Sequence, residues 1–126
     1  NGITNENKFC YKATCYETAR QIAKRLNIKK SNYTVAFQSR LDNKWLRPFS
    51  DEIIKKSGKI GEKNILCFSP SFVADCLETI IEIGDEYQEI FEKYGGEKVQ
   101  LVESLNDSDL WVKCLEKIVN DRKIKN

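Results

Sequence analysis

The sequence Ser71–Lys93, SFVADCLETIIEIGDEYQEIFEK, predicts a long helix with two unlike faces. Its apolar side chains recur at steps of three and four residues, the spacing that places them along one side of an α-helix. The residues predicted to be buried on that side are Phe72, Cys76, Ile80, Ile83, Tyr87, Ile90 and Tyr94. We therefore expect the rest of the chain to pack around this helix.

The opposite face of the predicted helix is acidic. Seven acids fall within eighteen residues that contain no lysine or arginine, namely Asp75, Glu78, Glu82, Asp85, Glu86, Glu89 and Glu92. Glu78, Glu82 and Glu86 share one stripe, where like charges cost an isolated helix about 0.2–0.5 kcal/mol per pair. Two interpretations stay open: a solvated face, or a row of carboxylates that meets a cation, because hard divalent metals prefer oxygen ligands.

The composition is that of a single globular domain. The 126 residues are 40% hydrophobic and 32% charged, and the net charge is +2, so the acidity of the helix is local. No apolar run reaches the roughly 18 residues of a membrane span, and no signal segment is present. We expect a soluble protein without a nucleic-acid partner, while association with a membrane surface stays open.

Cysteine and histidine usage narrows the chemistry. The five cysteines, Cys10, Cys15, Cys67, Cys76 and Cys114, include no CxxC pair, so neither a disulfide framework nor a zinc or iron–sulfur site is predicted. A reducing, intracellular compartment is expected. The chain has no histidine, the commonest general base near neutral pH. It also has no methionine and begins at Asn1, so we expect a processed or trimmed piece of a longer protein.

The whole chain predicts helices that alternate with short strands. Residues 1–9 are expected to be loop or disordered, helices are expected at 14–27, 51–56, 75–94 and 107–119, and strands at 33–38, 64–68 and 98–102. Capping-box patterns start the first helix at Thr14 and the central helix at Asp75, and Gly58 and Gly95 are expected to end helices. Because the strands are apolar on both faces, we predict an α/β fold of three layers with an incomplete parallel sheet of about three strands and four helices.

Polar side chains follow each predicted strand at the sheet edge where α/β proteins bind ligands. These residues are Gln38, Ser39 and Arg40; Ser69, Asp75 and Glu78; and Glu103, Ser104 and Asn106. The rim thus offers a guanidinium fork, hydroxyls and carboxylates. No glycine-rich phosphate loop is present.

Three ordered blocks of the sequence resemble the carboxy-terminal half of ferrochelatase. They are FQSRL at 37–41 with WLRP at 45–48 and SDE at 50–52, then SPSFVADCLETI at 69–80, and then Gly95–Gly96 through ESLN at 103–106. The segment CYET at 15–18 is also similar, so the resemblance runs from Tyr11 to about Val119. It implies insertion of ferrous iron into protoporphyrin, the last step of haem synthesis. The implied fold is chelatase-like (flavodoxin-like), with two similar α/β domains and the macrocycle between them.

The resemblance also implies the roles of particular residues. Glu78 takes the catalytic position, where it removes the pyrrole protons or handles the metal; the choice between these roles stays open. Glu82 and Glu86 are implied to lead metal or protons along the helix, and we group Asp75 and Cys76, beside Glu78, with that path. A carboxylate in an apolar porphyrin cleft would have a raised pKa through desolvation.

The porphyrin itself is implied to meet Trp45, Gln38, Ser39 and Arg40. Trp45 offers a flat surface to a flat ligand, and Arg40 could pair with a propionate. Without the resemblance, a tryptophan beside Pro48 would more often cover the edge of the core than contact a ligand. Many family members carry a histidine where this chain has Cys76. The family's essential histidine belongs to a region before this chain, so the isolated chain is expected to be inactive.

The remaining implications concern cofactors, partners and compartment. No tightly bound cofactor and no iron–sulfur cluster are expected; the substrates are ferrous iron and porphyrin, and the partner is the amino-terminal half of the same protein. The compartment is a bacterial cytoplasm or a haem-synthesising organelle (mitochondrion or plastid), and the oligomeric state stays open. The alternative is a non-enzymatic α/β module that binds a tetrapyrrole or a divalent cation, and a third hypothesis is a related chelatase for another metal or macrocycle.

Overall fold

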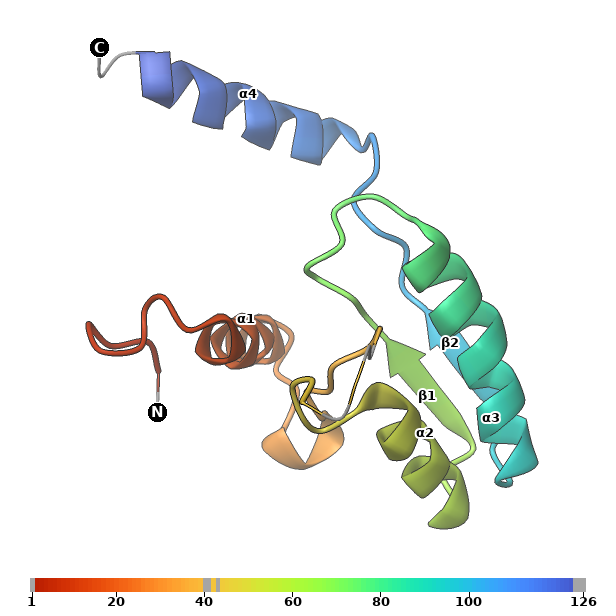
Figure 1. Ribbon diagram of the computed structural model, residues 1–126. Helices are drawn as coiled ribbons and strands as arrows, with labels where there is room; N and C mark the ends of the chain where they lie inside the picture. The colour runs from red at the N-terminus through yellow and green to blue at the C-terminus, as the bar shows by residue number, and fades with distance from the viewer. Residues whose placement is uncertain (1, 40–41, 43, 124–126) are drawn as a thin grey trace.

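The computed structural model describes residues 2–39, 42 and 44–123, and it has an α/β fold built around two parallel strands (Figure 1). In chain order the elements are α1 (Tyr11–Arg25), the short 3₁₀ helix η1 (Lys30–Asn32), α2 (Ser50–Lys59), β1 (Asn64–Cys67), the π-helix η2 (Glu78–Glu86), α3 (Tyr87–Lys93), β2 (Lys98–Leu101) and α4 (Asp109–Lys123). The predicted α/β class is confirmed. No helix of the described residues is long and apolar enough to cross a membrane.

The two strands and the helix between them form a β-helix-β unit. β1 and β2 run parallel, with Asn64 opposite Lys98 and Cys67 opposite Leu101. The core lies between the sheet and two helical segments, α2 and η2–α3, and its buried residues are Ile54, Ile83, Tyr87, Phe91 and Val99. Leu66 points away from this core and is 68% exposed. The described residues therefore cover one face of the sheet, and the second helical layer that we expected is not formed by them.

The central helix differs from the prediction in its winding. Its first nine residues are a π-helix, whose i→i+5 hydrogen bonds widen each turn, so residues four apart stay on one face while residues three apart diverge. The buried side chains are accordingly Thr79, Ile83, Tyr87 and Phe91, at steps of four. The α-helical spacing wrongly predicted Ile80 as buried: it is 52% exposed. The same spacing missed Phe91, which is fully buried.

The strand predicted at residues 33–38 is wrong. Only Phe37 makes a sheet-like contact, an isolated parallel bridge to Phe49. The Phe37 amide donates to the Pro48 carbonyl at 2.9 Å, and the Ser50 amide donates to the Phe37 carbonyl at 3.0 Å. Both phenylalanines are buried, so this bridge holds the segment against the start of α2. The segment pairs with a short loop rather than with a neighbouring strand, and the ladder ends after one bridge.

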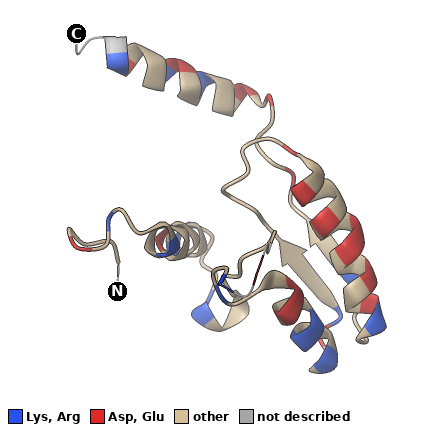
Figure 2. Ribbon diagram, viewed as in Figure 1, with Lys and Arg blue, Asp and Glu red and all other residues tan. Residues whose placement is uncertain are grey.

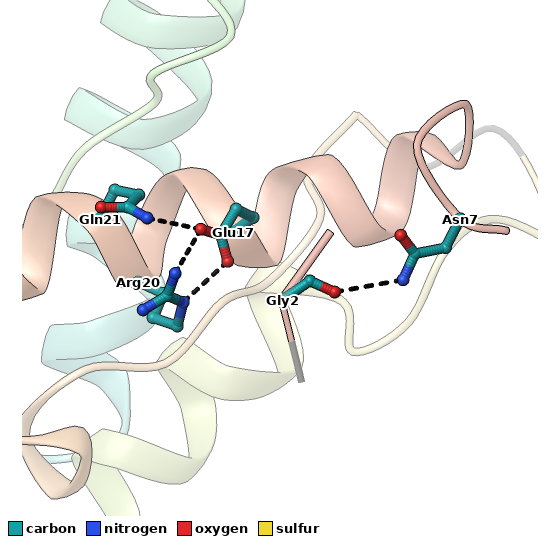
Figure 3. A network of polar contacts seen from close by, with 5 residues as sticks. All are labelled: Gly2, Asn7, Glu17, Arg20 and Gln21. Atoms are coloured by element: carbon teal, nitrogen blue, oxygen red, sulfur yellow. Dashed lines mark hydrogen bonds and ion pairs between the residues drawn. The ribbon is translucent and has the colours of Figure 1, made fainter. Parts of the chain in front are cut away.

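The first helix begins at Tyr11, three residues before the predicted capping box. Glu17 does not reach back to a helix end, because the Arg20 guanidinium and the Gln21 amide both donate to its carboxylate (Figure 3). Partners three and four residues on lie on the same side of the helix. The hydrogen bond from Arg20, followed by that from Gln21, lowers the pKa of Glu17 to about 2.

Two glycines show where the predicted helix ends hold and where they fail. Gly58 was predicted to close α2, but the helix continues through it to Lys59. Gly58 instead allows a close approach to α3, since a Cβ there would lie 2.9 Å from the Tyr94 carbonyl oxygen. Gly95, with φ +97°, follows the end of α3 as predicted.

Figure 1 also shows α4 projecting away from the sheet, and none of its residues from Asp109 to Arg122 is buried.

Candidate functional site

Acidic residues are concentrated along η2–α3 (Figure 2). Glu78, Glu82 and Glu86 line one shallow pocket of about 290 Å³ together with Leu77 and Ile81; we call it the acidic pocket. The wide turn of the π-helix keeps residues four apart on the same face. The three carboxylates that the sequence placed on one stripe are therefore brought together in space.

Glu78 is the first residue of η2, and its side chain is exposed. A hydrogen bond from the Cys76 thiol is the main cause that lowers the pKa of Glu78 below its ordinary value. Glu78 is exposed in this chain, and the rise of its pKa through desolvation in a porphyrin cleft stays a prediction. Glu86, two turns along, is also exposed, and its side chain makes no hydrogen bond or ion pair with the described residues.

Glu82 differs from its two neighbours because its carboxylate is fully engaged. One oxygen, Oε1, accepts from the Ser39 amide at 2.9 Å and from the Tyr87 hydroxyl at 2.8 Å. The other, Oε2, accepts from the Ser39 hydroxyl at 3.0 Å and from the Gln38 amide at 3.2 Å. Burial, together with the hydrogen bond to Glu82, raises the pKa of Tyr87, so this phenol stays protonated and donates.

The described residues that were predicted to contact porphyrin adjoin the acidic pocket. We call Gln38, Ser39 and Trp45 the Trp45 corner. The Trp45 ring nitrogen donates to the backbone carbonyl of Gln38 at 2.9 Å, and Trp45 is 38% exposed. The side-chain nitrogen of Gln38 donates to the Glu78 backbone carbonyl at 2.8 Å, and the side-chain oxygen of Gln38 accepts from the Ser69 hydroxyl at 2.8 Å. The fourth predicted residue, Arg40, lies outside the described residues.

Asp75 joins the loops that leave the two strands. Its carboxylate accepts from the Asn106 amide at 2.8 Å, the Ser104 backbone at 3.2 Å and the Thr79 hydroxyl at 3.1 Å. The hydrogen bond from Asn106 is the main cause that lowers the pKa of Asp75. The prediction that Asp75 caps the central helix is wrong, because η2 begins at Glu78 and Asp75 bonds across to the loop after β2. Its predicted place on the metal or proton path stays a prediction, as does that of the half-buried Cys76.

Sequence reasoning missed Thr79 and Tyr87 as residues that shape the site. Thr79 is 1% exposed, and its hydroxyl accepts from the Cys76 amide at 3.0 Å. The four-residue repeat of Thr79, Ile83, Tyr87 and Phe91 is visible in the sequence and could have indicated the π-helix. Such wide turns often occur at functional sites.

The described residues do not build a metal centre by themselves. No three of their His, Cys, Asp or Glu side chains lie close enough together to hold a metal ion. The five cysteines are free. This part of the chain therefore presents an acidic surface beside an aromatic corner rather than a closed ligand set.

Comparison with known proteins identifies the family. A family model for ferrochelatase matches residues 2–123. The ferrochelatase of Legionella pneumophila (strain Lens) is 46% identical over 121 residues, which cover 95% of this chain and 37% of that relative. The ferrochelatase of Coxiella burnetii (strain Dugway 5J108-111) is 44% identical over 117 residues, which cover 92% of this chain and 33% of that relative. The chain spans about a third of the length of these curated relatives, and it belongs to the ferrochelatase family.

Proposed function

We propose that this chain is the carboxy-terminal part of a ferrochelatase, whose full-length form inserts ferrous iron into protoporphyrin. The family membership supports this, and one structural observation carries it. The Glu78 carboxylate is exposed at the first turn of a π-helix, beside the Trp45 corner and in one pocket with two further carboxylates.

The chemistry of metal insertion suits these groups. The reaction exchanges two pyrrole N–H protons for a dication, so a base must face the ring plane and an anionic surface must attract the metal. The lowered pKa of Glu78 favours its ionised form, which can accept a proton and attracts a ferrous ion. The indole of Trp45 offers an apolar face to the macrocycle. The rest of the parent protein supplies the opposite wall and the remaining base.

The proposal is tested with the full-length protein by following protoporphyrin fluorescence as ferrous or zinc ion is inserted. Glu78→Gln keeps the shape of the side chain but removes its charge and its basicity. We expect insertion to fall by about 100-fold or more, since general acid–base catalysis contributes on the order of 10²–10⁴. The matched control is Glu89→Gln on the same helix, which is exposed and lies outside the acidic pocket. A wild-type rate in Glu78→Gln would overturn the assignment of this residue.

The same assay separates the competing functions. A non-enzymatic module would bind protoporphyrin and leave it unmetallated in the full-length wild-type protein. A related chelatase would metallate it, but competition among ferrous, cobalt and magnesium ions would favour a metal other than iron. Preferred insertion of ferrous iron supports the ferrochelatase proposal over both.

A further inference from the structure

The acids of the acidic pocket fall into two kinds. Glu78 and Glu86 are exposed, whereas Glu82 is half-buried and both of its oxygens accept two hydrogen bonds each. A carboxylate has about four acceptor positions, so Glu82 has a full set of partners. A group that relays a cation or a proton must exchange partners, and Glu82 would have to give up bonds to do so. Its geometry is that of a fixed anchor.

The bonds of Glu82 connect parts of the chain that are far apart in sequence. Three of the four donors belong to Gln38 and Ser39, more than forty residues earlier. The Gln38 side-chain nitrogen also donates to the Glu78 backbone carbonyl at the first turn of η2. The backbone carbonyl of Gln38 accepts a hydrogen bond from the Trp45 ring nitrogen. A short series of hydrogen bonds thus runs from Trp45 through Gln38 to both Glu78 and Glu82.

The backbone of the Trp45 corner depends on this anchor. Ser39 has φ +56°, the left-handed region that a residue with a side chain rarely adopts. Such conformations persist where the surroundings hold them. The backbone amide and the hydroxyl of Ser39 both donate hydrogen bonds to the Glu82 carboxylate.

We propose that Glu82 is a positioning residue, which ties the Trp45 corner to the π-helix and so sets the distance between the aromatic face of Trp45 and the carboxylate of Glu78. This inference rests on the proposed function, because those two groups would meet the macrocycle together. It replaces the role in metal or proton transfer that the family resemblance implied for Glu82. Glu86, which is free of such bonds within the described residues, keeps that role.

The test uses the full-length protein labelled with 5-fluorotryptophan, with the Trp45 fluorine signal assigned from Trp45→Phe. Without porphyrin, Glu82→Ala is expected to shift or broaden the Trp45 signal. The control Glu86→Ala removes the same charge from the same pocket and is expected to leave that signal in place. An unmoved Trp45 signal in Glu82→Ala, or an equal shift in Glu86→Ala, would overturn the proposal.

Kinetics of the same variants separate positioning from transfer. Positioning predicts that Glu82→Ala raises KM for porphyrin by tenfold or more while KM for iron stays within threefold. Glu82→Gln keeps an acceptor oxygen for Ser39, so it should restore most of the porphyrin KM and the Trp45 signal. If Glu82 transfers metal or protons instead, Glu82→Gln fails as badly as Glu82→Ala, and the defect appears in kcat or in KM for iron.

Two further outcomes keep the tests independent. If Glu82→Ala does not fold, the double variant Gln38→Ala/Ser39→Ala removes both loop side chains that donate to Glu82; a wild-type Trp45 signal in that variant would overturn the proposal. If the wild-type protein fails to metallate porphyrin, the proposed function is wrong, yet the fluorine signal still decides whether Glu82 holds the Trp45 corner.

Discussion

The hydroxyl of Thr79 holds the start of the π-helix, and its removal is the sharpest test of this part of the structure. Thr79 is 1% exposed, and its oxygen accepts from the Cys76 amide at 3.0 Å. The same hydroxyl lies within donating distance of Asp75 Oδ1 and of the Cys76 carbonyl oxygen, each 3.1 Å from Thr79 Oγ1. Thr79→Val replaces the hydroxyl with a methyl group of similar size. The amide of the half-buried Cys76 then loses its partner, the hydroxyl of the 1% exposed Thr79.

The expected cost follows from that orphaned amide. A buried donor without a partner costs about 1–3 kcal/mol. Amide hydrogen exchange of residues 76–83 in the full-length protein should therefore accelerate by about 5-fold to 150-fold if it occurs through local opening. Thr79→Ser is the matched control, because it keeps the hydroxyl and loses one methyl group, worth about 0.8 kcal/mol.

The order of the two variants decides the question. If the hydroxyl holds the helix start, exchange in Thr79→Val is faster than in Thr79→Ser. If packing of the methyl group dominates, the order reverses. Exchange at the wild-type rate in Thr79→Val would refute the reasoning outright.

Two further predictions concern packing and a buried thiol. Gly96→Ala should lower the free energy of unfolding by about 1–3 kcal/mol, because its Cβ would lie 2.3 Å from the Phe91 ring; Gly84→Ala, with 4.0 Å to its nearest neighbour, should cost nothing in the same thermal unfolding assay. Burial raises the pKa of the Cys67 thiol to about 11, so about one thiol in a thousand is ionised at pH 8 and iodoacetamide should modify the exposed Cys114 first. Equal alkylation rates of Cys67 and Cys114 in the folded protein would contradict this order. Because the unfolded Cys67 thiol ionises near pH 9 and the folded one near pH 11, the stability due to the neutral thiol should be lost as pH rises through that interval; a free energy of unfolding that stays constant there would contradict the raised pKa.

The elements that could be predicted are those fixed by local pattern. The strands Asn64–Cys67 and Lys98–Leu101 lie inside the predicted ranges, because each is a short apolar run between turn residues. The end of α3 before Gly95 follows from that glycine's positive φ. The predicted strand at 33–38 has the same apolar pattern but has no neighbouring strand among the described residues. Pairing depends on distant residues, so a local pattern cannot decide it.

The candidate site also has a part that the sequence could predict and a part that only the fold decides. Glu78, Glu82 and Glu86 could be found from their spacing, and they do share one pocket. Their different environments could not be found, because the donors to Glu82 come mainly from Gln38 and Ser39, which only the fold brings near.

The sequence by itself determined the α/β class, the acidic stripe and the family, because each of these is written in residue types and short spacings. Tertiary structure alone decided the winding of the central helix and the different environments of its carboxylates. A π-helix is selected by what it buries and bonds, here the Glu82 carboxylate toward Ser39 and Gln38 of the Trp45 corner. Those partners lie on other segments, so their effect appears only once the chain has folded.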